Sequence, residues 1–260
     1  SGYSYRSVCP AFMSGRIADI AIDINNENIW YVAVGSGGVW KTKNAGTTWM
    51  PLTDNMPFYS TGSITIDPND SSRIWVGTGE NVAGRHVGIG HGIYLSKDSG
   101  STWDDMGLNK SEHISKIIVH PDNSNIIWVA SQGPLWNSGG DRGLFMSTDG
   151  GNTWSNKLYV NEWTGVTDII IDPTNPDILY AATWQRHRNV ASLIDGGPGT
   201  SIYKSIDGGN TWNEIDSGLP SSNMGKIGLA ISPMKPEVIY AAIELDRRSG
   251  AVFRSVSYTH

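Results

Sequence analysis

The sequence predicts an all-β fold built from repeated units of four antiparallel strands. One observation is composition: among 260 residues there are 31 glycines, 11 tryptophans and only 17% charged residues, which is typical of a turn-rich β protein. The other is a repeated turn, spelled TKNAGTTW, SKDSGSTW, STDGGNTW and SIDGGNTW. Its final tryptophans are 54, 51 and 58 residues apart, at Trp49, Trp103, Trp154 and Trp212. A period near 50 is typical of propeller blades or solenoid units.

Three short apolar runs precede each turn. The first alternates and ends in Asp-Pro or a variant, as in TGSITIDPND, and the second is nearly continuous, as in RIWVGTG. The third is bracketed by small residues, as in GIYLS, and the tryptophan of the turn opens a fourth run. Short runs rich in β-branched and aromatic residues, bounded by Asp, Pro and Gly, predict strands. Four antiparallel strands per repeat describe a blade of a β-propeller.

The repeats predict a single propeller domain, residues 1–260, with about five blades. The first three strands occur five times, but the turn and fourth strand occur four times, because Ser257 stands where the fifth turn would carry aspartate. The segment 3–8, YSYRSV, is expected to supply the missing strand and close the ring, since closure removes an open edge. The alternative is a fragment of a ring of six to eight blades. The expected blade repeats are 9–53, 54–107, 108–160, 161–217 and 218–260 plus strand 3–8.

Composition argues against several classes of partner. The formal charge of −6 and the lack of a run of five like charges argue against nucleic acid. Cys9 is the only cysteine, so no disulfide within the chain is expected. No stretch approaches 18 apolar residues, so no membrane insertion is expected, and no signal peptide is recognised in this chain.

The repeated turn, called the repeat turn below, is expected to be structural. Its aspartate can accept hydrogen bonds from backbone N–H groups of its own loop, and its glycine supplies a positive φ. Near-identical carboxylates spread around a ring cannot converge on one substrate, and the first turn carries an asparagine instead. The turn residues assigned this structural role are Asn44, Trp49, Asp98, Trp103, Asp149, Trp154, Asp207 and Trp212.

The repeat turns resemble the Asp-box, or BNR, repeat of sialidases, xyloglucanase-type glycosidases and the sortilin-type (VPS10) propeller. Three turns match the box fully and one carries the Asn substitution, so the resemblance covers nearly the whole chain. The stretch from Gly165 to Trp212 is most similar to bacterial VPS10- or sortilin-like propellers of the glycosyl-hydrolase type. The resemblance implies an exported bacterial protein, secreted or periplasmic. It leaves the activity open, because such propellers include enzymes, receptors and assembly factors.

A ligand is expected on the face formed by the connections between the second and third strands. The first–second connections are tight and repetitive, whereas the second–third connections are long and irregular in blades two to four. Insertions confined to one kind of loop crowd one face of the ring, where loop-borne function sits. The fourth–first connections lie on this same face. The residues expected to bind ligand are Arg85, His86, Trp136, Trp184, Gln185, Arg186, His187, Arg188 and Arg247.

Two function classes follow from these loops. The first is a non-catalytic module that binds a glycan or a peptide, with Trp136 or Trp184 as a stacking platform. The second is a glycoside hydrolase with two facing carboxylates, although no spacing selects a pair. A self-assembling scaffold is a third reading, with self-association expected if the ring is incomplete. The carboxylates available for catalysis are Glu80, Asp141, Asp195, Glu244 and Asp246.

No metal or cofactor is expected. His86, His91 and His187 match no strong zinc-ligand spacing. The glycine-rich stretches GSGG and DGGPGT do not open helices, which argues against phosphate loops.

Overall fold

The computed structural model is all-β, which confirms the predicted fold class. It describes residues 16–82, 84, 87–215, 217–245 and 249–255. These residues form twenty strands in five antiparallel sheets, and each sheet is one blade. The described part of the chain contains no helix, so none there is long and apolar enough to span a membrane.

The blades follow one another along the chain. Blade one contains β1 (Ile17–Ile22), β2 (Trp30–Val34), β3 (Gly38–Thr42) and β4 (Met50–Pro51). Blade two contains β5 (Thr61–Asp67), β6 (Asp70–Thr78), β7 (Ile93–Ser96) and β8 (Asp104–Asp105). Blade three contains β9 (Ile114–His120), β10 (Asn123–Ser131), β11 (Gly143–Ser147) and β12 (Ser155–Leu158). Blade four contains β13 (Thr164–Ile171), β14 (Leu179–Arg188), β15 (Leu193–Asp195), β16 (Ile202–Ser205) and β17 (Asn213–Glu214). Blade five contains β18 (Met224–Ser232), β19 (Lys235–Leu245) and β20 (Ser249–Ser255).

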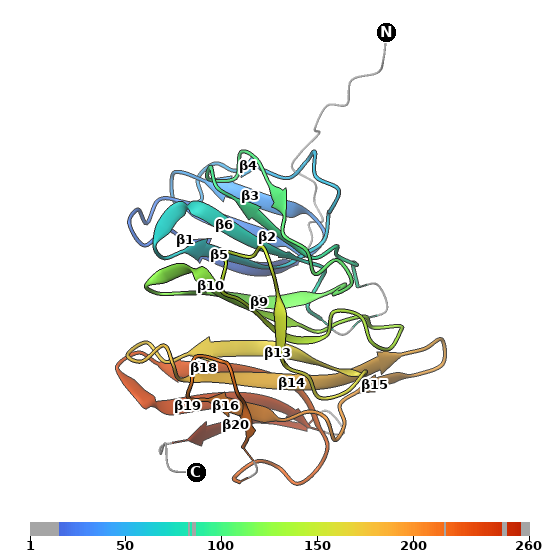
Figure 1. Ribbon diagram of the computed structural model, residues 1–260. Helices are drawn as coiled ribbons and strands as arrows, with labels where there is room; N and C mark the ends of the chain where they lie inside the picture. The colour runs from blue at the N-terminus through green and yellow to red at the C-terminus, as the bar shows by residue number, and fades with distance from the viewer. Residues whose placement is uncertain (1–15, 83, 85–86, 216, 246–248, 256–260) are drawn as a thin grey trace.

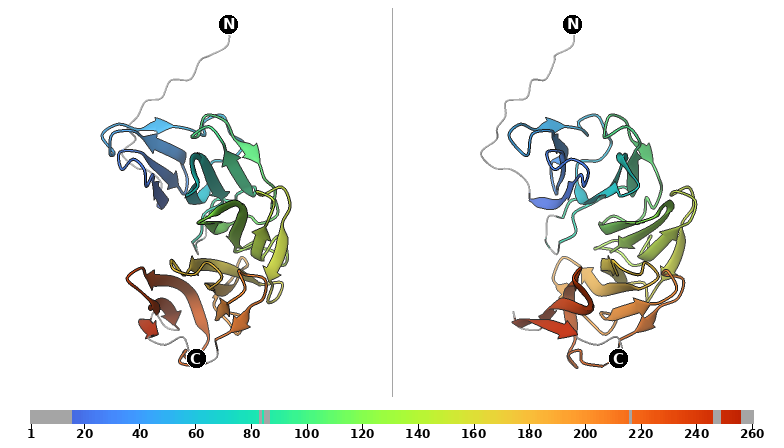
Figure 2. Two further views of the ribbon diagram at one scale, coloured as in Figure 1. Left: turned by 60° about the vertical axis from the view of Figure 1, so that its left-hand side comes forward. Right: turned by 90° about the vertical axis from the view of Figure 1, so that its left-hand side faces the viewer.

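The five blades are arranged as an arc, with the first strand of each blade packed beside the first strand of the next. Figure 2 shows blade one, in blue, and blade five, in red, at the two ends of this arc. The strand expected at 3–8 lies outside the described residues. An arc of this kind is consistent with part of a propeller ring.

The core lies between neighbouring sheets, because both faces of each middle strand are buried. In β6, Trp75 packs against blade three, whereas Ile74 and Val76 pack against blade one. This two-residue alternation is what a strand between two layers requires. It also explains why the second apolar run of each repeat is nearly continuous in the sequence.

The repeat turns are held by their own side chains. In blade three, Asp149 Oδ1 accepts hydrogen bonds from the Ser147 hydroxyl at 2.8 Å and from the Thr153 backbone N–H at 2.9 Å, and the Thr153 hydroxyl donates to Oδ2 at 2.6 Å. Asp98 and Asp207 make the same contacts in blades two and four. Asn44 makes the corresponding contacts with its amide: Oδ1 accepts from Thr42 and from the Thr48 backbone N–H, and Nδ2 donates to the Thr48 hydroxyl.

These hydrogen bonds predict that the protein loses stability in acid. They lower the pKa of Asp98, Asp149 and Asp207 to about 2, with the bond from the following threonine hydroxyl as the largest cause. A carboxyl whose folded pKa is depressed stabilises the fold above its unfolded pKa, and this stability is lost as pH falls through the folded pKa. We therefore expect the melting temperature to fall as the pH is lowered from about 4 to about 2.

The triple variant Asp98→Asn, Asp149→Asn, Asp207→Asn keeps the hydrogen bonds, as Asn44 shows, but removes the titration. Its melting temperature should depend less on pH over this range, whereas Asp149→Ala should melt earlier at every pH. Equal acid sensitivity of wild type and the Asn variant in differential scanning calorimetry would contradict this role of the aspartates.

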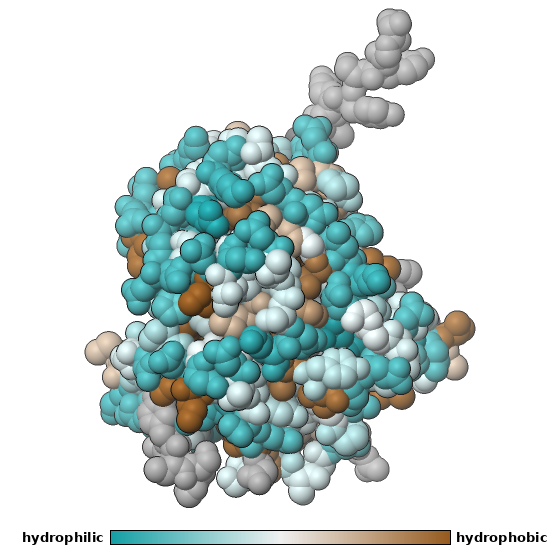
Figure 3. Space-filling model, in the orientation of Figure 1, coloured by the Kyte–Doolittle hydropathy of each residue, from teal (hydrophilic) through white to brown (hydrophobic). Residues whose placement is uncertain are grey.

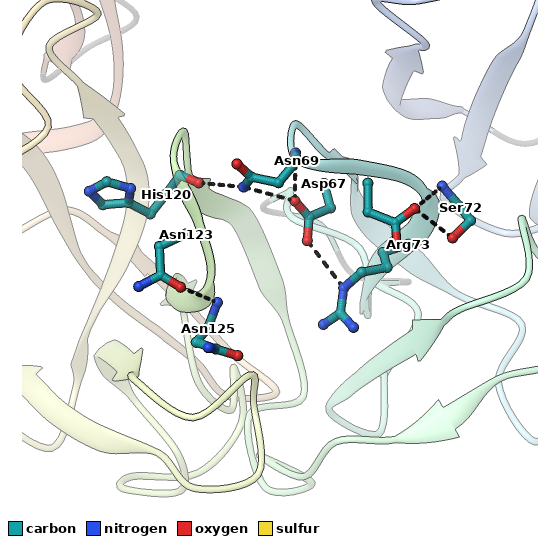
Figure 4. Close-up of polar contacts among 8 residues, drawn as sticks. Asp67, Asn69, Ser72, Arg73, His120, Asn123 and Asn125 are labelled. Carbon is teal, nitrogen blue, oxygen red and sulfur yellow. Dashed lines mark hydrogen bonds and ion pairs between the residues drawn. The ribbon is translucent and has the colours of Figure 1, made fainter.

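The turns between the first and second strands tie neighbouring blades together, as Figure 4 shows. Asp67 accepts from the Asn69 backbone N–H at 2.9 Å and pairs with Arg73 at 3.1 Å. The Asn69 side-chain amide then donates to the backbone carbonyl of His120, in blade three, at 3.0 Å. The polar groups of the β5–β6 turn therefore hold that turn and its junction with blade three.

Candidate functional site

The opposite face is formed by the connections between second and third strands together with those between fourth and first strands. We call this face the mouth and define it by residues 79–82, 84, 87–92, 106–113, 132–142, 159–163 and 184–201, together with Lys226 and Glu244. Backbone hydrogen bonds join the two kinds of connection. The Gly90 N–H donates to the backbone carbonyl of Glu112 at 2.8 Å, and the Gly139 N–H donates to that of Glu162 at 2.8 Å. The longest insertion forms the β14–β15 hairpin, which projects to the right in Figure 1. Figure 3 shows an apolar tip at that place, and Val190 is 95% exposed.

The loop of blade two reaches across to three other blades. The Asn81 carbonyl accepts hydrogen bonds from the side chains of Gln132, at 3.5 Å, and Lys226. The Val82 carbonyl accepts one from Arg186 at 3.2 Å. Side chains from blades three, four and five thus donate hydrogen bonds to two adjacent backbone carbonyls of blade two. This brings Gln132, Arg186 and Lys226 together.

Glu80 anchors the base of this loop. Its carboxylate is buried, pairs with Arg16 at 2.5 Å and accepts hydrogen bonds from Ser36 at 3.3 Å and from Gly88 N–H at 3.0 Å. A carboxylate committed to these partners positions the loop rather than facing a ligand.

Two cations lie against the Trp184 ring. The Arg186 guanidinium is 4.9 Å from the centre of the Trp184 ring, and the Lys226 ammonium is 5.4 Å from it. Trp184 is only 1% exposed, so the expectation that its ring serves as an open stacking platform is wrong. The physical reason is that the loop of blade two folds over β14 and draws both cations onto the ring.

Burial lowers the pKa of both cations. The pKa of Lys226 falls to about 8, mainly through desolvation and then through the nearby Arg186 charge. The pKa of Arg186 falls to about 9, again through desolvation first. The Arg186 Nε and the Trp184 Nε1 are buried without a hydrogen-bond partner among the described residues. This part of the mouth therefore contains buried cations and N–H donors whose hydrogen-bonding capacity the described protein groups do not fully satisfy.

Two acidic residues lie near the cations, on chain segments that pass on either side of Gly225. Asp195 and Glu244 flank Gly225, where an added Cβ would lie 2.9 Å from the Asp195 backbone oxygen and 3.2 Å from the Glu244 Cβ. Burial raises the pKa of Asp195, and the Glu244 charge raises it further. The Asp195 Oδ1 is buried and lacks a hydrogen-bond partner among the described residues, whereas Glu244 is exposed.

The remaining catalytic candidates do not join this pair. The Asp141 carboxylate accepts from the Lys110 backbone N–H at 2.9 Å, which fixes the loop of blade three. Asp246 lies outside the described residues, as do the expected ligand-binding residues Arg85, His86 and Arg247.

An aromatic pair lies at the rim of the mouth. The rings of Trp163 and His187 meet edge to face, with their centroids 4.1 Å apart. Both side chains are half-buried, and Trp136 in the adjacent loop is 43% exposed. Arg188, which follows His187, donates its backbone N–H to Leu135 at 2.9 Å, so the strand bearing His187 runs beside the loop that carries Trp136.

Trp163 is not among the residues expected to bind ligand, because it lies in a fourth–first connection and those residues come from the second–third connections. The alternation of strands already placed the fourth–first connections on the same face, and the segment NEWTG was the available signal.

Arg142 organises the loop of blade three. It is fully buried, and its guanidinium donates to the backbone carbonyls of Gln132 at 2.7 Å and Trp163 at 3.2 Å. It also donates to the backbone carbonyls of Gly139 and Asn137, each at 3.3 Å, and to that of Pro134.

The Trp163 carbonyl further accepts the Arg186 backbone N–H at 3.2 Å, so two chain segments fix the rim tryptophan. Gln185 acts similarly in blade four, where its Oε1 accepts from Gly199 N–H at 2.9 Å.

The protein-family model described as "Sortilin, neurotensin receptor 3" (Sortilin-Vps10) matches residues 37–159 and 91–225. A probable oligoxyloglucan-reducing end-specific xyloglucanase of Neosartorya fischeri is 24% identical over 233 residues, covering 82% of this chain and 25% of the relative. Xyloglucanase Xgh74A of Acetivibrio thermocellus is 26% identical over 238 residues, covering 82% and 27%. The chain thus spans about a quarter of the length of these relatives.

Solved structures share the fold. An ancestral GH74 enzyme superposes with a TM-score of 0.69 at 21% identity, covering 93% of this chain and 30% of that one. The GH74 enzyme of Niastella koreensis gives 0.65 at 20% identity, covering 95% and 37%.

Proposed function

Because the chain belongs to the Sortilin-Vps10 family, we propose that its mouth binds a glycan of the xyloglucan type, in a protein that works outside the cell. The observation that carries the proposal is the rim pair of Trp163 and His187. This pair lies next to Arg186, whose backbone N–H donates to the Trp163 carbonyl. An aromatic ring offers an apolar face to a sugar ring, and nearby polar groups bind its hydroxyls. The names of the xyloglucanases at 24–26% identity support this class of ligand.

Trp163 is expected to be the stacking platform, because its backbone is fixed on both sides and its ring is held by His187. We expect Trp163→Ala to weaken binding of a xyloglucan oligosaccharide about tenfold or more, which corresponds to about 1.4 kcal/mol. Trp49→Ala is the matched control, since Trp49 is 40% exposed and belongs to a repeat turn. Isothermal titration calorimetry measures both, with circular dichroism to confirm folding.

If wild type binds xyloglucan and Trp163→Ala binds equally well, Trp163 is not the platform. If wild type binds no member of a glycan array, the proposed function fails.

Hydrolysis is the second candidate function, favoured by Asp195 and Glu244. The raised pKa of the half-buried Asp195 suits it to donate a proton, and the exposed Glu244 side chain is placed where a base or nucleophile would be needed. On this reading Asp195→Asn and Glu244→Gln each abolish release of reducing sugar while leaving oligosaccharide affinity intact. Release that persists in both variants would exclude this pair.

A further inference from the structure

Lys226 is a half-buried amine that the described residues hold without a carboxylate. It lies in β18 beside the Trp184 ring, and its ammonium donates to the Asn81 carbonyl. Arg186 lies on the same ring, and neither cation forms an ion pair in the part of the chain that the structure describes. An aromatic face and one carbonyl favour the charged form of an amine less than a paired carboxylate does.

The groups around Lys226 act in opposite directions on its pKa. Burial lowers the pKa most, and the Arg186 charge lowers it further. The acidic residues Asp168, Asp195 and Glu244 raise it, and the balance is a pKa of about 8. About a tenth of the Lys226 side chains are therefore neutral at pH 7. Only the neutral amine has the lone pair that attacks an electrophile.

Two buried donors next to Lys226 lack an acceptor. The Arg186 Nε and the Trp184 Nε1 have no hydrogen-bond partner among the described residues, and their side chains are 0% and 1% exposed. Buried donors without partners are unfavourable, so this environment favours an added acceptor, above all an anion. A sugar or a peptide cannot contact groups with so little exposed surface. The expected ligand is therefore a molecule of a few atoms.

We propose that Lys226 is a carbon dioxide site, at which the neutral amine forms a carbamate. The nitrogen lone pair attacks the carbon atom, an N–C bond forms, one C=O electron pair moves onto oxygen, and the nitrogen releases one proton to water. The resulting carbamate carries one negative charge and two acceptor oxygens, and their donors are Arg186 Nε and Trp184 Nε1. Its remaining N–H still donates to the Asn81 carbonyl. No oxidant is needed, and the inference does not depend on glycan binding.

Lys116 is the matched control, because it occupies the same place in the first strand of blade three. Ile117 and Ile227, which follow the two lysines, both pair with the second strand of their blade. Lys116 is also half-buried, but none of the cation–aromatic contacts among the described residues involves it. The two lysines therefore differ mainly in the groups that surround their amines.

The test uses the full chain in bicarbonate buffer under a fixed pressure of carbon dioxide. Triethyloxonium converts a carbamate into a stable ethyl ester, and tandem mass spectrometry locates the ester. We expect the trapped fraction at Lys226 to exceed that at Lys116 at least about tenfold, because charge-assisted hydrogen bonds from two buried donors stabilise its carbamate. With ¹³C-labelled bicarbonate, the NMR signal of this carbamate should be lost in Lys226→Arg and kept in Lys116→Arg.

Trapping on wild type keeps the test informative if Lys226→Arg does not fold. The trapped fraction at Lys226 should also rise as the pH is raised from about 6 to about 8, because more of its amine is neutral. No carbamate on Lys226, or equal fractions on Lys226 and Lys116, would overturn the proposal.

Discussion

Replacing Arg142 with leucine is expected to destabilise the protein by at least about 3 kcal/mol, because five backbone carbonyls lose a donor inside the protein. The guanidinium has no exposed surface, and burial lowers its pKa to about 10, so it remains charged at neutral pH. Arg142→Lys should recover part of the loss, since an ammonium has three donors and lacks the planar fork. Urea denaturation followed by circular dichroism measures both variants.

Arg142→Leu should also weaken glycan binding in the folded fraction, because Arg142 holds the Trp163 carbonyl and the loop that carries Trp136. If Arg142→Leu has the same midpoint of urea unfolding as wild type, these carbonyls find other hydrogen-bond donors, which would contradict the prediction.

Trp128→Ala is expected to cost about 3–5 kcal/mol, the range for a buried tryptophan replaced by alanine. Its ring is 1% exposed and stacks at 6.0 Å on His120, and its Nε1 donates to the Gly208 carbonyl at 3.1 Å. Removing it opens the junction of blades three and four and leaves the fourth repeat turn without its support. Trp49→Ala should cost far less, because Trp49 is 40% exposed and packs on Trp30 of its own blade.

Calorimetric melting of the two variants gives the comparison. Similar losses for Trp128→Ala and Trp49→Ala would contradict the view that the repeat turns stabilise the arc through the preceding blade.

The repeats were sufficient to predict the blades, because each blade is specified by local signals. These signals are the alternation of the first strand, the continuous apolar run of the second strand and the hydrogen bonds within the repeat turn. Each is contained in a stretch of about ten residues. The aspartate of the repeat turn bonds to threonine four positions later, so its contacts follow from sequence alone.

The arrangement of the mouth could be predicted only in part. Loop lengths indicated the face, but the contact of Lys226 with Asn81 joins residues 145 positions apart, and no local pattern encodes it. That contact, with Arg186, is what buries Trp184. The placement of Asp195 near Glu244 likewise depends on the segment after β15 running beside β18.

Hydrogen exchange of the full chain, measured with and without a saturating xyloglucan oligosaccharide, tests the central claim most directly. Binding at the mouth predicts slower exchange in peptides covering 132–142, 159–163 and 186–200, with the turns at 67–73 and 172–177 unchanged. Protection confined to those turns, or demonstrated binding without protection of 159–163, would contradict the assignment of the mouth as the glycan site.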